Sequence, residues 1–287
     1  MANPILRQKL DRREFFVAPG IQDMITAAIA NHVGIDIVYG SGYWLTASAF
    51  GLPDAGIATF TQMLDRMATL VRTSNGAVIA DADTGYGGLL NVHHTVRGYE
   101  EAGVSAVQLE DQEFPKKCGH TPFKRVISKE DMVEKIQVAC AARKDPNMLV
   151  IARTDARASE GLDAALARAE AYRAAGADIL FVEALTSEEE MRIACEHVRA
   201  PMMANMSNGG LTPMRSAAEM EDIGFALAIF PAMTSLIAAS AMETALRRMK
   251  AEGTGEPSGM PIFNFKEFCS LIGFEDVWAF EKQWAKG

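Results

Sequence analysis

The chain has 287 residues, of which 49% are hydrophobic and 23% charged, a composition typical of a globular protein with a substantial core. Its formal net charge of −9, without a lysine- or arginine-rich block, argues against a nucleic-acid-binding surface. Four cysteines without paired metal-ligand spacing indicate reduced thiols. The N-terminal residues lack the apolar stretch of a signal peptide, and no apolar run reaches about 18 residues. We therefore expect a cytoplasmic protein with neither a nucleic-acid nor a membrane partner.

Short apolar runs alternate with longer helical patterns along the chain, an order typical of βα units around a parallel sheet. Eight runs are predicted as strands: 15–18, 36–39, 77–82, 106–110, 148–153, 178–183, 201–205 and 225–230. The clearest helices are predicted over 21–33, 59–73, 92–102, 129–142, 162–175 and 187–197. Ser187, followed three residues later by Glu190, predicts a capping box at the start of the last of these helices.

The C-terminal part has a different composition. A helix is predicted over 232–250, followed by a glycine- and proline-rich linker over 251–261 and an amphipathic, aromatic-rich tail over 263–284. We therefore divide the chain into a catalytic barrel, residues 1–250, and a linker with a helical tail, residues 251–287. The apolar surface of the tail predicts burial, either against a partner subunit or on its own barrel.

Polar side chains gather at the C-terminal ends of six predicted strands. Examples are Tyr39, Ser41, Asp81, Asp83, Glu110, Asp111, Arg153, Asp155, Glu183 and Asn205. In a (β/α)8 barrel the C-terminal ends of all strands meet at one face, where the active site lies. N-capping would explain some of the acids, but not an arginine and a glutamate at strand ends. With eight strands, this pattern favours a (β/α)8 TIM barrel over an open doubly wound sheet.

Three of these carboxylates form a set of hard oxygen ligands. Asp81 and Asp83 alternate along a strand and should point the same way, and Glu110 ends the next strand. An oxygen-only set suits Mg²⁺, with Mn²⁺ as an alternative, better than zinc. The glycines at 85–88 do not form a phosphate loop, because no Gly-Lys-Ser/Thr follows them.

Cys118 lies in the segment Lys116-Lys117-Cys118-Gly119-His120. Nearby cations favour the thiolate over the thiol, and the polar neighbours argue against burial in a core. Cys118 is therefore predicted to have a chemical role. The other cysteines, Cys140, Cys195 and Cys269, are predicted to be small core residues.

Together these motifs resemble those of the isocitrate lyase and phosphoenolpyruvate mutase superfamily. The resemblance rests on Tyr39-Gly40-Ser41-Gly42, Gly51-Leu52-Pro53-Asp54, Asp81-Ala82-Asp83-Thr84-Gly85-Tyr86-Gly87, Glu110-Asp111-Gln112, Lys116-Lys117-Cys118-Gly119-His120 and Ala152-Arg153-Thr154-Asp155. Within the superfamily, the Lys-Lys-Cys-Gly-His loop belongs to carbon–carbon lyases. The chain is most similar to the branch that contains 2-methylisocitrate lyase, 2,3-dimethylmalate lyase and petal death protein.

This resemblance implies an assembly and a set of ligands. The last helix of the barrel would be exchanged between subunits, in a homotetramer built from dimers. Mg²⁺ would be held by Asp83 directly, and by Asp81 and Glu110 directly or through water. The substrate would be bound by a larger set: Ser41, Gly42, Tyr43, Gly119, Arg153, Glu183 and Asn205.

The implied reaction is retro-aldol cleavage of a substituted 2-hydroxy di- or tricarboxylate, similar to 2,3-dimethylmalate or 2-methylisocitrate, into a 2-oxo acid and a carboxylate. Cys118 would protonate the new carbanion. Tyr39 is the first candidate for the base, with a neighbouring lysine or metal-bound hydroxide as alternatives. Lys116 and His120 complete the expected catalytic set.

Several other functions remain open on the same scaffold. They are an oxaloacetate hydrolase or decarboxylase, a phosphonate mutase or hydrolase, and a non-catalytic sensor of an oxo acid. Cys118 disfavours the phosphonate enzymes, and the intact set of acids disfavours the sensor. Tyr43 and Trp44 stand where methylisocitrate lyases have small glycines, and Asn208 stands where relatives usually have glutamate. The physiological substrate is therefore left open by the sequence.

Overall fold

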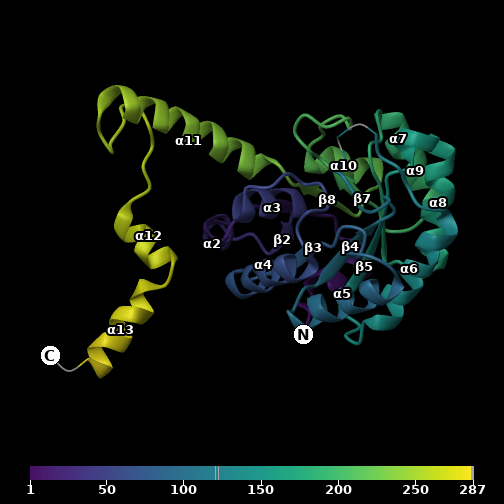
Figure 1. The fold of residues 1–287 in the computed structure, drawn as a ribbon, viewed down its shortest axis with the longest axis horizontal. Coiled ribbons are helices and arrows are strands. Elements are labelled where there is room, and N and C mark those ends of the chain that lie inside the picture. The colour runs from purple at the N-terminus through teal and green to yellow at the C-terminus, as the bar shows by residue number, and fades with distance from the viewer. Residues whose placement is uncertain (120, 122, 286–287) are drawn as a thin grey trace.

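The computed structural model describes residues 1–119, 121 and 123–285, and it shows a barrel of parallel strands surrounded by helices (Figure 1). The strands of the described residues are β1 Phe16–Ile21, β2 Ile37–Gly40, β3 Ala77–Asp81, β4 Ala106–Glu110, β5 Leu149–Thr154, β6 Ile179–Val182, β7 Met203–Asn205 and β8 Leu227–Phe230. They pair in the order β6-β5-β4-β3-β2-β1-β8-β7. A parallel bridge between Leu180 of β6 and Met202, next to β7, joins the two ends. The predicted (β/α)8 barrel and all eight predicted strands are confirmed.

The strands are apolar along most of their length because both of their faces are buried. In β3, Ile79 belongs to the core inside the barrel, whereas its neighbour Val78 belongs to the core between strands and helices. This burial on both faces is typical of parallel sheets, and it explains why the strand sequences do not alternate between apolar and polar residues. The short helix α1, Ile5–Asp11, adds the fully buried Leu6 to the inner core.

Helices follow the strands and cover the outside of the barrel. Their bounds are α2 Met24–His32, α3 Gly42–Phe50, α4 Phe60–Thr73, α5 Leu89–Glu101, α6 Lys129–Ala142, α7 Arg157–Glu160, α8 Leu162–Ala174, α9 Glu188–Val198 and α10 Ala217–Ile223. The six helices that we predicted here are confirmed. The predicted capping box of α9 is only half formed: Ser187 accepts from the Glu190 N–H, but the Glu190 carboxylate binds Arg157 and the Thr186 N–H instead.

The C-terminal helices form an arm that stands away from the barrel in Figure 1. It consists of α11 Met233–Glu252, α12 Phe265–Leu271 and α13 Phe274–Trp284. Among the described contacts, the start of α11 packs on β1, where Thr234 donates to the Gly20 carbonyl, and α12 touches α2. Phe265, Trp278 and Trp284 are each more than half exposed. These side chains of the tail are thus largely uncovered in the single chain, and burial against a partner subunit or on the chain's own barrel stays a prediction.

Within the described residues, no helix is both long enough and apolar enough to span a membrane. All four cysteines are free thiols. Cys269 is buried as predicted, whereas Cys140 and Cys195 are only partly buried at the edge of the core.

Candidate active site

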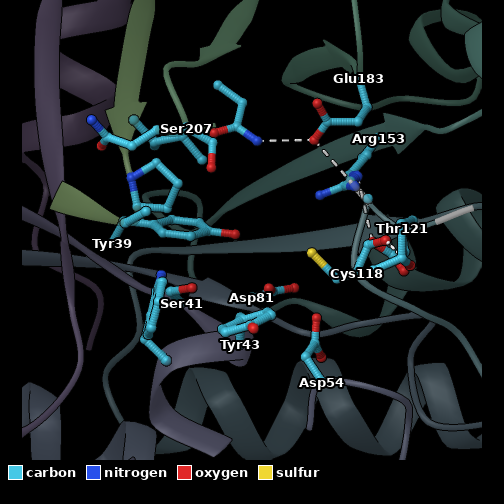
Figure 2. A pocket seen from close by; sticks show the side chains of 18 of the residues that line it. Tyr39, Ser41, Tyr43, Asp54, Asp81, Cys118, Thr121, Arg153, Glu183 and Ser207 are labelled. Atoms are coloured by element: carbon cyan, nitrogen blue, oxygen red, sulfur yellow. Dashed lines mark hydrogen bonds and ion pairs between the residues drawn. The ribbon is translucent and has the colours of Figure 1, made fainter. Parts of the chain in front are cut away.

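A cavity of about 310 Å³ opens at the C-terminal ends of the strands (Figure 2). Its volume is within the range of small-molecule sites. Most of the predicted site residues line it: Tyr39, Ser41, Tyr43, Asp81, Glu110, Lys116, Cys118, Gly119, Arg153, Glu183 and Asn205. Gly42 and Asp83 lie directly behind this lining, in contact with Asp81 and Lys116 respectively. His120 lies outside the described residues.

The three predicted metal ligands lie together, although not as the alternation of a strand would place them. Asp81 ends β3 and Glu110 ends β4, but Asp83 lies beyond its strand in a left-handed conformation with φ 49°. Its backbone N–H donates to Asp81 Oδ1 at 3.3 Å. The Gly42 N–H donates to Asp81 Oδ2 at 3.2 Å, and a β-carbon at Gly42 would come within 2.9 Å of that oxygen. Only glycine therefore lets α3 begin so close to the acids.

The pKa values of two of these acids are raised, which indicates that their negative charges are not fully compensated. Burial, with Asp81 and Asp54 nearby, raises the pKa of Asp83 to about 6, although Lys116 opposes the shift. Burial also raises the pKa of Glu110 well above its usual value, against the effect of Arg153. Crowded carboxylates in a dry site are costly unless a cation neutralises them.

A hard divalent cation fits this environment. Glu110 Oε1 is buried and has no hydrogen-bond partner among the described residues. The donor set consists of carboxylate oxygens, which Mg²⁺ and Mn²⁺ prefer. In the described part of the chain, no group of three or more Asp, Glu, His or Cys side chains is arranged closely enough to hold a metal ion by itself. Two or three carboxylates with water and substrate oxygens would complete the coordination, as is usual for Mg²⁺.

Lys116 is part of this acid cluster. Its ammonium binds Asp54, and it lies 2.8 Å from Asp83 Oδ1, with only 3% of the side chain exposed. Burial lowers its pKa, but Asp83, Glu110 and Asp54 outweigh burial and raise the pKa well above the usual value. As long as these acids are charged beside it, Lys116 stays protonated and cannot accept a proton. Asp54 had no role in the sequence interpretation, although it belongs to the Gly-Leu-Pro-Asp motif.

Arg153 occupies the other side of the cavity, where its guanidinium points inward (Figure 2). It makes two hydrogen bonds to Asp155, at 2.8 and 3.0 Å, and an ion pair with Glu183 at 3.1 Å. Burial lowers its pKa, but Asp155, Glu183 and Glu110 raise it well above the usual value. Among the described contacts these acids engage Nε and Nη2, so Nη1 is the donor that remains for the carboxylate of a substrate.

Tyr39 is buried inside the barrel mouth, and its hydroxyl donates to Gln108 Oε1 at 3.3 Å. Burial and the charge of Asp81 raise its pKa well above 10. The neutral phenol is a hydrogen-bond donor at ordinary pH, and this state does not suit the role of base that we predicted for it.

The segment that carries Cys118 lies over the cavity, and its sulfur points inward (Figure 2). The Cys118 N–H donates to the Asp54 carbonyl at 3.2 Å. A β-carbon at Gly119 would lie 2.1 Å from Arg153 Nη2, so only glycine allows this approach. Of the cations predicted to surround the thiol, Lys116 binds acids instead and Lys117 is exposed.

The remaining predicted substrate ligands line the same cavity. Ser41 is at the N-cap of α3, yet within the described residues its side chain makes no capping hydrogen bond. Asn205 Nδ2 donates to Glu183 Oε2 at 3.0 Å. Tyr43 packs against Trp44 with ring centroids 4.7 Å apart, and both aromatic residues line the cavity as one wall.

Comparison with known proteins agrees with this geometry. Residues 6–250 match the family described as phosphoenolpyruvate phosphomutase. The chain is 42% identical over 282 residues to 2,3-dimethylmalate lyase of Eubacterium barkeri, covering 98% of both chains. It is 43% identical over 280 residues to 2-methylisocitrate lyase of Halalkalibacterium halodurans, covering 98% of this chain and 92% of the other.

Solved structures show the same architecture. A crystal structure of 2,3-dimethylmalate lyase superposes with a TM-score of 0.92 at 34% identity, covering 99% of this chain and 96% of the other. Oxaloacetate acetylhydrolase in complex with 3,3-difluorooxalacetate superposes with a TM-score of 0.91 at 32% identity, covering 97% and 95%.

Proposed function

The chain belongs to the phosphoenolpyruvate phosphomutase family, and from this premise we propose that it is a Mg²⁺-dependent carbon–carbon lyase. Its substrate would be a substituted 2-hydroxy di- or tricarboxylate similar to 2,3-dimethylmalate or 2-methylisocitrate. The products would be a 2-oxo acid and a carboxylate. The observation that carries this proposal is the thiol of Cys118, which points into a cavity between the acid cluster and Arg153.

The two ends of the cavity suit the two ends of such a substrate. Asp81, Asp83 and Glu110 would hold the cation, which when bound supplies positive charge to polarise the oxygens of the 2-hydroxy acid. Arg153, with Ser41 and Asn205, would bind carboxylate. The aromatic wall of Tyr43 and Trp44 would contact the alkyl substituent.

The bond changes of the reaction balance as follows. The 2-hydroxyl gives its proton to a hydroxide ion from solvent, which becomes water, because Tyr39 and Lys116 are protonated here. The C2–C3 bond then breaks, and the C2 oxygen becomes the carbonyl of the oxo acid. The electron pair left on C3 takes the proton of the Cys118 thiol, which acts as general acid. Tyr39, a neutral phenol, would donate a hydrogen bond to an oxygen of the substrate rather than remove a proton.

A hydrolase acting on oxaloacetate is the second candidate function. It is favoured by the close superposition on oxaloacetate acetylhydrolase. Such an enzyme would need water at the position where the lyase substrate carries its alkyl group, and the aromatic wall disfavours this.

A panel of 2-hydroxy and 2-oxo acids separates these functions. We expect 2,3-dimethylmalate or 2-methylisocitrate to release pyruvate in the presence of Mg²⁺, measured by coupling to NADH oxidation. Oxaloacetate should release little oxalate and phosphonopyruvate little phosphate. Faster release of oxalate or phosphate than of pyruvate would contradict the lyase assignment.

The arm of α11–α13 supports a proposal about assembly. We keep the division into a barrel, 1–250, and a linker with a helical tail, 251–287, and propose that the tail, which contains α12 and α13, packs on a partner subunit within a homotetramer. Its exposed apolar side chains would be costly in water unless another chain covers them. The free thiols are consistent with a cytoplasmic location, which stays a prediction.

Truncation after Lys250 tests this assembly. Because the apolar helices α12 and α13 would be lost, we expect the truncated chain to dissociate or to aggregate, measured by size-exclusion chromatography with light scattering. Trp278→Ser should weaken the oligomer more than Lys282→Ser, a polar change on the same helix. A truncated chain that keeps the full-length oligomeric state would disprove exchange of the arm.

A further inference from the structure

Lys124 lies in the segment between β4 and α6, six residues after Cys118, and its ammonium is turned inward. Only 6% of its side chain is exposed. Its Nζ donates to the Gly119 carbonyl at 2.6 Å and to Asp155 Oδ1 at 2.7 Å. A single buried ammonium thus joins the residue after Cys118 to an acid that follows β5.

Asp155 is fixed independently of Lys124. It accepts two hydrogen bonds from Arg153, and its own N–H donates to Asp111 Oδ1 at 2.9 Å. Asp111 Oδ2 is held in turn by the Tyr172 hydroxyl at 2.8 Å. Burial raises the pKa of Asp155, but Arg153 and Lys124 outweigh it and hold the pKa below the usual range. Asp155 is therefore a rigid, charged anchor at the floor of the site.

Burying an ammonium is costly unless good partners surround it, and here the partners are a carbonyl of the Cys118 segment and a carboxylate that follows β5. At its other end the Cys118 segment is held by Lys116, which binds Asp54 and Asp83. Cys118 lies between these two buried lysines. Lys116 connects the segment to the acid cluster, and Lys124 connects it to Arg153 through their common partner Asp155.

We propose that Lys124 is a positioning residue for Cys118: by binding both the Gly119 carbonyl and Asp155, it holds the thiol over the carboxylate bound by Arg153. This inference rests on the acid role of Cys118 in the proposed function. Lys124 is not among the described residues that line the cavity, so it is placed to act through Cys118 rather than on the substrate. Its removal should therefore impair proton delivery more than substrate binding.

The experiment compares Lys124→Met with Lys124→Arg and with Arg125→Met. Arg125 is the adjacent cation, but its side chain is 80% exposed and pairs with Glu113 at the surface, so this variant is the matched control. Steady-state kinetics would use the best substrate of the panel. Alkylation of Cys118 by iodoacetamide, followed by mass spectrometry of its peptide, gives a readout that does not depend on activity.

For Lys124→Met we expect kcat to fall roughly 10- to 100-fold, the effect of losing one hydrogen bond to a buried charge, with KM changing much less. Cys118 should be alkylated faster, on the order of 10-fold, and oxalate with Mg²⁺ should protect it less. Lys124→Arg should recover part of both effects, because it retains a donor and the charge. Arg125→Met should behave as the unmodified chain.

Equal kcat and equal alkylation rates in Lys124→Met and Arg125→Met would overturn the proposal. If Lys124→Met loses kcat as expected but Cys118 is alkylated at the same rate as in the unmodified chain, the proposal would also be overturned. If Lys124→Met does not fold, as judged by circular dichroism, Lys124→Gln is measured in the same way. Should Cys118→Ser keep full activity while Lys124→Met still exposes the thiol, the acid role fails but the positioning by Lys124 stands.

Discussion

Cys118→Ser is expected to lower kcat by about 10²- to 10⁴-fold, the usual contribution of a positioned general acid. The hydroxyl has nearly the size of the thiol but is a much weaker acid, so proton transfer to the carbanion slows. KM should change little, because Arg153 and the metal site lie on the other walls of the cavity. The measurement is steady-state kinetics on the best substrate of the panel.

Cys140→Ser is the matched control, since Cys140 lies on the outer helix α6, away from the site, and should keep full activity. Alkylation of Cys118 should inactivate the enzyme, and oxalate with Mg²⁺ should protect it. Near-full kcat in Cys118→Ser would show that the thiol is not the acid and would remove the main support for the lyase.

Asp83→Ala should abolish catalysis without unfolding the barrel, with a loss in kcat on the order of 10³-fold or more, because charge stabilisation by the metal is worth several kcal/mol. The raised pKa of Asp83 means that its buried negative charge destabilises the folded chain, so removing the carboxylate should not unfold the barrel. After the substitution, Lys116 still binds Asp54. Activity, the melting temperature and calorimetric Mg²⁺ binding would be measured together.

Asp65→Ala, an exposed acid on α4, is the control and should bind Mg²⁺ as the unmodified chain does. Dialysis against EDTA should abolish turnover, and Mg²⁺ or Mn²⁺ should restore it better than Zn²⁺, because the ligands are oxygens. Full activity in EDTA, or unchanged Mg²⁺ affinity in Asp83→Ala, would refute the metal site.

Several features of the fold could be predicted because they depend on local patterns. Strands such as β3 and β5 are buried on both faces, so each is a short apolar run that ends in polar residues. The helices α4 and α6 begin at Thr59 and Ser128, which cap them. In contrast, α3 is apolar on most sides and α7 has a single turn, so neither has a periodic pattern to detect.

In the candidate site, too, some properties depend on the local sequence and others on the tertiary structure. Sequence alone determined which chemistry was available: carboxylates and an arginine at strand ends, and a thiol in a glycine-containing segment. Tertiary structure decided the charge state and the partner of each group. Lys116 lies two residues before Cys118 in the sequence, but 62 residues separate it from Asp54, which it binds.

Lys124 and Asp155 are likewise 31 residues apart, and burial together with the charge of Asp81 keeps Tyr39 a neutral hydrogen-bond donor. The identity of a side chain is local, and so is its tendency to end a strand or cap a helix. Its pKa and its hydrogen bonds depend on burial and on charges brought from distant parts of the chain, and these exist only once the barrel has closed.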